Sequence, residues 1–174
     1  MTSNRAPWRA AGTLVVVWLL LLPHDSGAAG HEGAPTPTPG AQRTVDFSTY
    51  RGKVVVVDFW ASWCTPCRRS LPWLDAMQRK YADAGLVVIG INEDQAPEDA
   101  AAFLEEFPVD FRIVNDPDGE IARAFELIAM PSTYVIARDG TVVARHLGFK
   151  TAKESEYEAL LQRLLEDSAA SSQR

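Results

Sequence analysis

The 174-residue sequence contains only two cysteines and three histidines, and these low numbers exclude several classes of protein. A structural zinc site normally takes four ligands, yet His24 and His31 lie near the N-terminus and His146 stands alone. Basic residues are also fewer than acidic ones: the sequence has 17 Lys and Arg and 23 Asp and Glu, which gives a formal net charge of −6. Nucleic-acid-binding domains usually carry a basic surface. We therefore expect no bound metal and no nucleic-acid partner.

The sequence also lacks an apolar run of the roughly 20 residues that a membrane-spanning helix needs. A shorter run, Ala10–Leu22, follows Arg5 and Arg9 and is followed by the small residues 26–29. This pattern is typical of a secretion signal. We predict that residues 1–29 form a signal peptide or a retained N-terminal membrane anchor. The remainder would then be periplasmic or otherwise extracytoplasmic.

The rest of the chain divides into a spacer, one domain and a tail. Residues 30–42 contain alternating prolines, which favour an extended linker. Residues 43–167 carry the apolar periodicity of a folded domain, and residues 168–174 are expected to be a disordered tail. We expect strands at 44–47, 53–60, 86–92, 109–114, 132–137 and 141–147, with helices at 65–82, 97–107, 118–125 and 153–167. Strands that alternate with helices predict an α/β fold with a central mixed sheet.

The two cysteines, Cys64 and Cys67, are separated by two residues and follow an apolar strand. A disulfide between them would close almost no loop and would remove little entropy from the unfolded chain. A zinc site or an inert disulfide remains an alternative, but a Cys-X-X-Cys pair that opens a helix after a strand indicates a redox centre.

Three separated segments carry a resemblance to a known family. Residues 57–67, Val-Asp-Phe-Trp-Ala-Ser-Trp-Cys-Thr-Pro-Cys, closely resemble the active-site segment of thioredoxins, and Pro72 matches the proline of their active-site helix. Residues 129–134 resemble their cis-proline loop. The additional residues at 97–114 and the export signal are similar to the TlpA/ResA branch of thiol–disulfide oxidoreductases. The resemblance implies a thioredoxin fold with an inserted helix and strand.

The helix start gives the two cysteines different roles. Free backbone N–H groups and the helix dipole would stabilise a thiolate on Cys64. That thiolate would attack a partner disulfide, and Cys67 would resolve the mixed disulfide. Thr65 and Pro66 determine how many N–H donors reach the sulfur, so we expect them to tune the reduction potential.

Three further positions are candidate site residues. Asp58 continues a buried strand, where a carboxyl group has a raised pKa, and it could accept the proton of Cys67; the alternative is a carboxylate that merely ends the strand. Pro131 is predicted to be cis, which would present the backbone of Met130 to an extended client. Trp63 should lie beside the site. Glu93 and Asp94 are expected on a solvated face.

The sequence thus predicts an exported thiol–disulfide oxidoreductase that reduces protein disulfides. Many TlpA-like proteins have Asn where this chain has Asp58, and the Asp of cytoplasmic thioredoxins favours reduction. The resemblance suggests clients in cytochrome c maturation or copper-site assembly, and a membrane thiol-electron transporter as reductant. No cofactor is expected beyond the Cys64–Cys67 disulfide. The alternatives are a disulfide-forming oxidase on the same fold, a copper chaperone that uses both cysteines, or a redox-inert adaptor.

Overall fold

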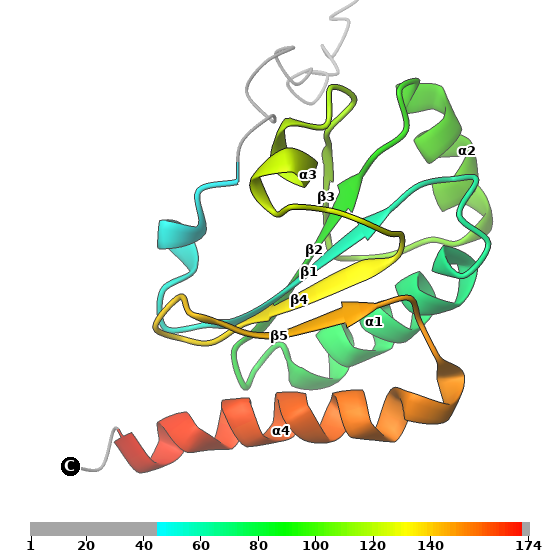
Figure 1. Ribbon diagram of the computed structural model, residues 1–174. Coiled ribbons are helices and arrows are strands. Elements are labelled where there is room, and N and C mark those ends of the chain that lie inside the picture. The colour runs from blue at the N-terminus through cyan, green and yellow to red at the C-terminus, as the bar shows by residue number, and fades with distance from the viewer. Residues whose placement is uncertain (1–44, 172–174) are drawn as a thin grey trace, which may run out of the picture. The chain divides into compact units, whose positions relative to one another are not determined.

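A computed structural model describes the backbone of residues 45–171 and the side chains up to residue 166. The predicted signal or anchor and the whole predicted linker, residues 30–42, lie outside the described residues. The centre of the domain is a five-stranded mixed sheet (Figure 1) with the strands β1 (Val54–Trp60), β2 (Leu86–Asn92), β3 (Arg112–Asn115), β4 (Ser132–Ile136) and β5 (Val142–Leu147). Their order is β3-β2-β1-β4-β5. β1 is parallel to β2 and antiparallel to β4, which confirms the predicted thioredoxin-like α/β sheet.

β1 is buried along its whole length because helices cover both faces of the sheet. Its side chains alternate between two apolar clusters: Val54 and Val56 belong to one, while Val55 and Val57 belong to the other. Asp58 continues the first set by the same alternation. Because side chains alternate along a strand, the carboxyl group of Asp58 points into the core.

Helices on the two faces complete these clusters. The helices α1 (Cys67–Tyr81), α2 (Pro97–Glu106) and α4 (Glu154–Ser171) contribute buried side chains to the first cluster, and α3 (Glu120–Ala124) contributes to the second. Figure 1 shows α1 and α4 on the opposite side of the sheet from α3. α2 and β3 form the helix and strand expected near residues 97–114. No helix among residues 45–171 is both long and apolar enough to cross a membrane.

The main disagreement with the sequence prediction is at the start of the domain, where an edge strand was expected at 44–47. The prediction is wrong for the described part: Phe47–Tyr50 form a short 3₁₀ helix, η1. The Asp46 side chain accepts a hydrogen bond from the Ser48 backbone N–H at 2.9 Å. Such local side-chain bonding competes with strand pairing. At the other end, α4 continues to Ser171, four residues past the expected end of the helix.

We predict that the packing of α4 against the sheet depends strongly on Leu161, which is 2% exposed in the first cluster. Leu161→Ala should lower the free energy of unfolding by about 2–5 kcal/mol, because it removes buried methyl groups and leaves a cavity. Urea titration measures the change. Glu166→Ala, an exposed position on the same helix, is the control and should change stability by less than about 0.5 kcal/mol. Equal effects of the two substitutions would contradict this packing.

Candidate active site

The cysteine pair lies in the turn that joins the C-terminal end of β1 to α1. The Cys64 N–H donates to the Ala61 carbonyl at 3.0 Å, and the Cys67 N–H donates to the Cys64 carbonyl at 3.0 Å. Cys64 and Cys67 form a disulfide with an S–S distance of 2.03 Å. α1 begins at Cys67, so Cys64 lies in the turn before the first helical residue and not inside the helix.

The two cysteines differ in their access to solvent. Cys64 keeps 4% of its surface exposed, whereas Cys67 is fully buried. The order of attack, with Cys64 as nucleophile and Cys67 as resolving thiol, stays a prediction. Trp63 is 67% exposed next to Cys64, and Thr65 is also exposed. Pro66 caps α1 and has no N–H of its own, so it places no donor at the helix start.

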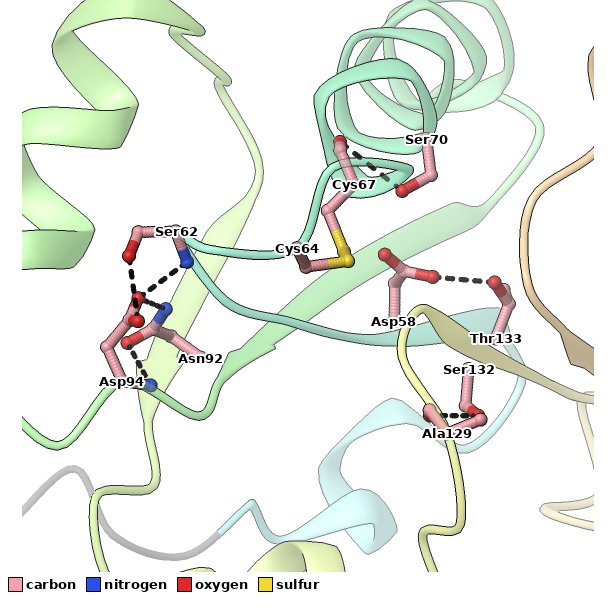
Figure 2. The surroundings of a disulfide bond; sticks show 10 residues. All are labelled: Asp58, Ser62, Cys64, Cys67, Ser70, Asn92, Asp94, Ala129, Ser132 and Thr133. Carbon is pink, nitrogen blue, oxygen red and sulfur yellow. Dashed lines mark hydrogen bonds between the residues drawn. A yellow bond between two sulfur atoms is a disulfide. The ribbon is translucent and has the colours of Figure 1, made fainter.

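Asp58 is the buried acid of the site. Figure 2 shows its carboxyl group between the disulfide and Thr133, with one oxygen directed toward the sulfur atoms. The Thr133 hydroxyl donates to the other oxygen at 2.6 Å. The oxygen that faces the disulfide, Oδ2, has no hydrogen-bond partner among the described residues. That oxygen is free to take up a proton.

Burial raises the pKa of Asp58 to about 7, and the hydroxyls of Thr133 and Ser70 lower it by less. The sheet register explains why no cation opposes this effect: the neighbours of Asp58 are Gly90 on β2 and Thr133 on β4. A Cβ at Gly90 would lie 2.8 Å from Ile113 Cδ1 and 3.1 Å from Trp60 Nε1, so a side chain there would require these neighbours to shift. The raised pKa of Asp58 agrees with the sequence prediction.

The loop before β4 forms the second side of the site. The Met130–Pro131 peptide bond is cis, as predicted. The Ser132 hydroxyl donates to the Ala129 carbonyl at 2.7 Å, and the Gly148 N–H donates to the Pro131 carbonyl at 2.8 Å. These bonds fix the loop on both sides of the cis bond. Figure 2 shows the Ser132–Ala129 bond next to Thr133, the hydrogen-bond partner of Asp58.

Asp94 is a site residue that the sequence analysis missed. It was expected on a solvated face, but it is only 3% exposed. Its carboxylate accepts hydrogen bonds from the Ser62 N–H and the Ser62 hydroxyl, both at 2.9 Å, and from the Asn92 amide at 2.8 Å. Asp94 therefore anchors the segment that leads into Cys64 (Figure 2). The local signal was weak, because Ser62 lies 32 residues away in the sequence.

Glu93 departs from the same expectation. It is half buried, and burial together with the neighbouring Asp116 raises its pKa to about 7. Asp116 in turn accepts the backbone N–H groups of Glu120 and Ala122 at the start of α3. No group of three or more potential metal ligands occurs among the described side chains.

Comparison with known proteins places this geometry in a family. A family model described as Redoxin matches residues 29–161, which is most of the chain. The chain belongs to the Redoxin family. Within that family, the disulfide turn, the cis-proline loop and the relatives below identify a TlpA/ResA-type thioredoxin-like protein, as predicted.

Several relatives of this redoxin carry informative names. "Thiol-disulfide oxidoreductase ResA" of Bacillus thuringiensis is 26% identical over 114 residues, which cover 66% of each chain. "Thioredoxin-like protein YneN" of Bacillus subtilis is 33% identical over 109 residues, covering 61% of this chain and 63% of the relative. The redoxin thus spans slightly less than two thirds of the length of these curated relatives.

A solved structure adds support for the fold. A candidate thiol:disulfide interchange protein DsbE from Chlorobium tepidum has a TM-score of 0.67 and is 39% identical, over 68% of this chain and 84% of the other. The predicted enzyme class, a thiol–disulfide oxidoreductase, agrees with the names of these relatives and with the Cys64–Cys67 disulfide.

The buried acid has a consequence for stability that can be measured. The pKa of Asp58 in the folded redoxin, about 7, lies above the ordinary value of 3.8, so the folded state holds a proton that the unfolded state releases. This contribution is fully present below about pH 4 and is lost as the pH rises through 7. Asp58→Asn removes the titration. The stability of the variant relative to the wild type should therefore increase with pH over this window, by up to about 4 kcal/mol.

Urea titration of both oxidised proteins from pH 4 to pH 8 measures this difference. Glu93 titrates in both proteins, so its contribution cancels. A stability difference that does not change with pH would mean that Asp58 is ionised throughout in the folded protein.

Proposed function

We propose that this redoxin is an extracytoplasmic thiol–disulfide oxidoreductase that reduces disulfides in client proteins. The observation that supports the proposal most strongly is the joint position of a reactive disulfide at a helix start, a buried acid and a cis-proline loop. The electrons are carried by Cys64 and Cys67, and the reaction needs no organic cofactor.

The first step is attack by the Cys64 thiolate on one sulfur of the client disulfide. A bond forms between Cys64 Sγ and that sulfur, and the client disulfide breaks. The other client sulfur leaves as a thiolate and takes a proton from water. The position before the first turn of α1 stabilises the attacking thiolate, because the helix N-terminus carries partial positive charge.

The second step releases the client. Asp58 Oδ2 lies unpartnered on the side of the disulfide and accepts the proton of Cys67, directly or through a water. The Cys67 thiolate attacks Cys64 Sγ, the mixed disulfide breaks, and the second client sulfur leaves as a thiolate. The client has gained two electrons and the redoxin has lost two, which regenerates the Cys64–Cys67 disulfide.

The direction and location of the reaction follow from separate features. The Asp at position 58 favours the reductase over a disulfide-forming oxidase. The apolar segment at 10–22 supports export, with a membrane tether if the segment is retained. A membrane thiol-electron transporter would then restore the dithiol, and cytochrome c maturation or copper-site assembly would supply clients. A copper chaperone is the second candidate, since two thiolates are soft ligands.

We predict that the reduced protein, supplied with dithiothreitol, accelerates the precipitation of insulin. Cys64→Ser should abolish this activity, because the attacking thiolate is lost. Cys67→Ala should retain the attack but release clients slowly. Turbidity measures the rate, and dithiothreitol alone is the control. Wild-type protein that binds Cu(I) stoichiometrically but leaves insulin unreduced would favour the copper chaperone instead.

The Cys67→Ala variant also identifies the clients. Expressed in cells in place of the wild type, it should hold exported proteins through Cys64 in mixed disulfides that dithiothreitol releases. The Cys64→Ser/Cys67→Ala double variant is the matched control and should capture none. Capture of cytoplasmic proteins alone would contradict the proposed location.

The role of Asp58 is testable in the resolving step. Dithiobis(nitrobenzoate) reacts with the reduced protein in two phases: attack by Cys64 releases the first coloured thionitrobenzoate ion, and resolution by Cys67 releases the second. Asp58→Asn should slow the second phase by about 10²-fold. The wild-type rate of this phase should rise through pH 7 as Asp58 ionises. The first phase serves as the internal control; slowing of both phases alike would show that Asp58 has no role specific to resolution.

A further inference from the structure

A basic groove runs along the edge of the sheet, although the protein as a whole is acidic. The groove has a volume of about 450 Å³ and is lined by β5, α4 and the segment that joins them. Four basic residues line it, together with one acidic residue, Glu156: the basic residues are Arg145, Lys150, Lys153 and Arg163. Its floor includes the partly buried Tyr157 and Leu160.

Two of these cations are already engaged. Lys153 pairs with Glu156 at 3.0 Å, and Arg145 donates to the Glu126 carbonyl at 3.0 Å. Lys150 and Arg163 make no ion pair with any side chain that the structure describes.

The groove carries a positive potential that affects its neighbours. The pKa of His146, which also lines the groove, is lowered by burial and in addition by the charge of Lys153. His146 is therefore mostly neutral near pH 7 and adds no cation of its own. The excess of positive charge comes from the lysine and arginine side chains.

The groove adjoins the active-site loop. Leu147, at the end of β5, pairs with Ser132 at the start of β4. The next residue, Gly148, donates its N–H to the carbonyl of cis-Pro131 at 2.8 Å. The end of β5, which lines the groove, is thus hydrogen-bonded to the cis-proline loop.

We propose that the groove binds an extended acidic segment of the client protein, next to the cysteine that Cys64 attacks. The inference rests on the proposed function and narrows its substrate class to clients with Asp or Glu near the reactive disulfide. Lys150 and Arg163 supply the charge complementarity, and Tyr157 and Leu160 provide apolar contact for the segment.

The shape of the surface favours a peptide over a flat anionic membrane. The groove is concave, so a bilayer surface could reach its rim but not its floor. β5 is also an edge strand of the described sheet, and its side chains Val142 and Leu147 are about half exposed. An edge of this kind offers backbone groups and apolar side chains to an extended chain.

The test compares two short peptides that differ only in charge. Each carries one cysteine as a mixed disulfide with thionitrobenzoate; one has Asp and Glu on both sides of it, and the other has Asn and Gln. Reduced wild-type protein should attack the acidic peptide about tenfold faster at low ionic strength. The preference should fall to about twofold in 0.5 M salt, because salt screens exposed charges.

Variants locate the preference on the protein. Lys150→Gln/Arg163→Gln should reduce it to about twofold at low salt. Lys53→Gln/Arg112→Gln removes the same charge from exposed positions, at the start of β1 and on the opposite edge strand, and should leave the preference unchanged. Equal rates for the two peptides, or equal loss in both double variants, would overturn the inference.

A chemistry-free measurement separates this inference from the proposed function. The same peptides with Ser in place of Cys cannot react, and the acidic one should shift the NMR amide signals of β5 and Lys150. If insulin and both peptides are reduced but no preference or shift is seen, only the groove inference fails. If nothing is reduced while the shifts occur, the proposed function fails and the groove still binds acidic segments.

Discussion

The burial of the Asp58 carboxyl group beside the disulfide is the constraint on which the site depends. Water is excluded there, and the hydrogen-bond partner of the carboxyl is a neutral hydroxyl, so the proton is held near neutral pH. An acid that exchanges its proton close to pH 7 can accept one from a thiol without a large cost. The same burial makes the folded protein less stable when Asp58 is ionised, so reactivity and stability oppose each other at this residue.

Hydrogen bonds fix each half of the site, the cysteine turn and the cis-proline loop, separately. Asp94, beyond the end of β2, accepts three hydrogen bonds and fixes the segment before Cys64. The cis-proline loop is held between the Ser132–Ala129 bond and the Gly148–Pro131 bond. Both anchors belong to strand ends in the middle of the sheet, which are among the most rigid parts of such a fold.

The sequence predicted those parts of the site that depend on local pattern or on a family motif. The motif around the cysteines predicted the roles of Cys64 and Cys67, and the buried strand before them predicted a buried Asp58. The motif at residues 129–134 predicted the cis bond of Pro131. Asp94 was missed because its function comes from a partner 32 residues away, and an acidic pair in sequence usually marks a solvated surface. The basic groove was missed for a similar reason, since its cations come from β5, the following loop and α4 and meet only after folding.

The glycine opposite Asp58 on β2 also limits how the protein can change. A lysine or arginine at Gly90 would be the simplest way to give the carboxyl a counter-ion and to lower its affinity for protons. Packing opposes that route, since the first side-chain atom would already crowd Ile113, Phe111 and the Trp60 ring. The apolar side chains packed around Gly90 thus help to keep the pKa of Asp58 raised. Lowering the pKa of Asp58 in this way, by evolution or by design, would require the surrounding core to be repacked as well.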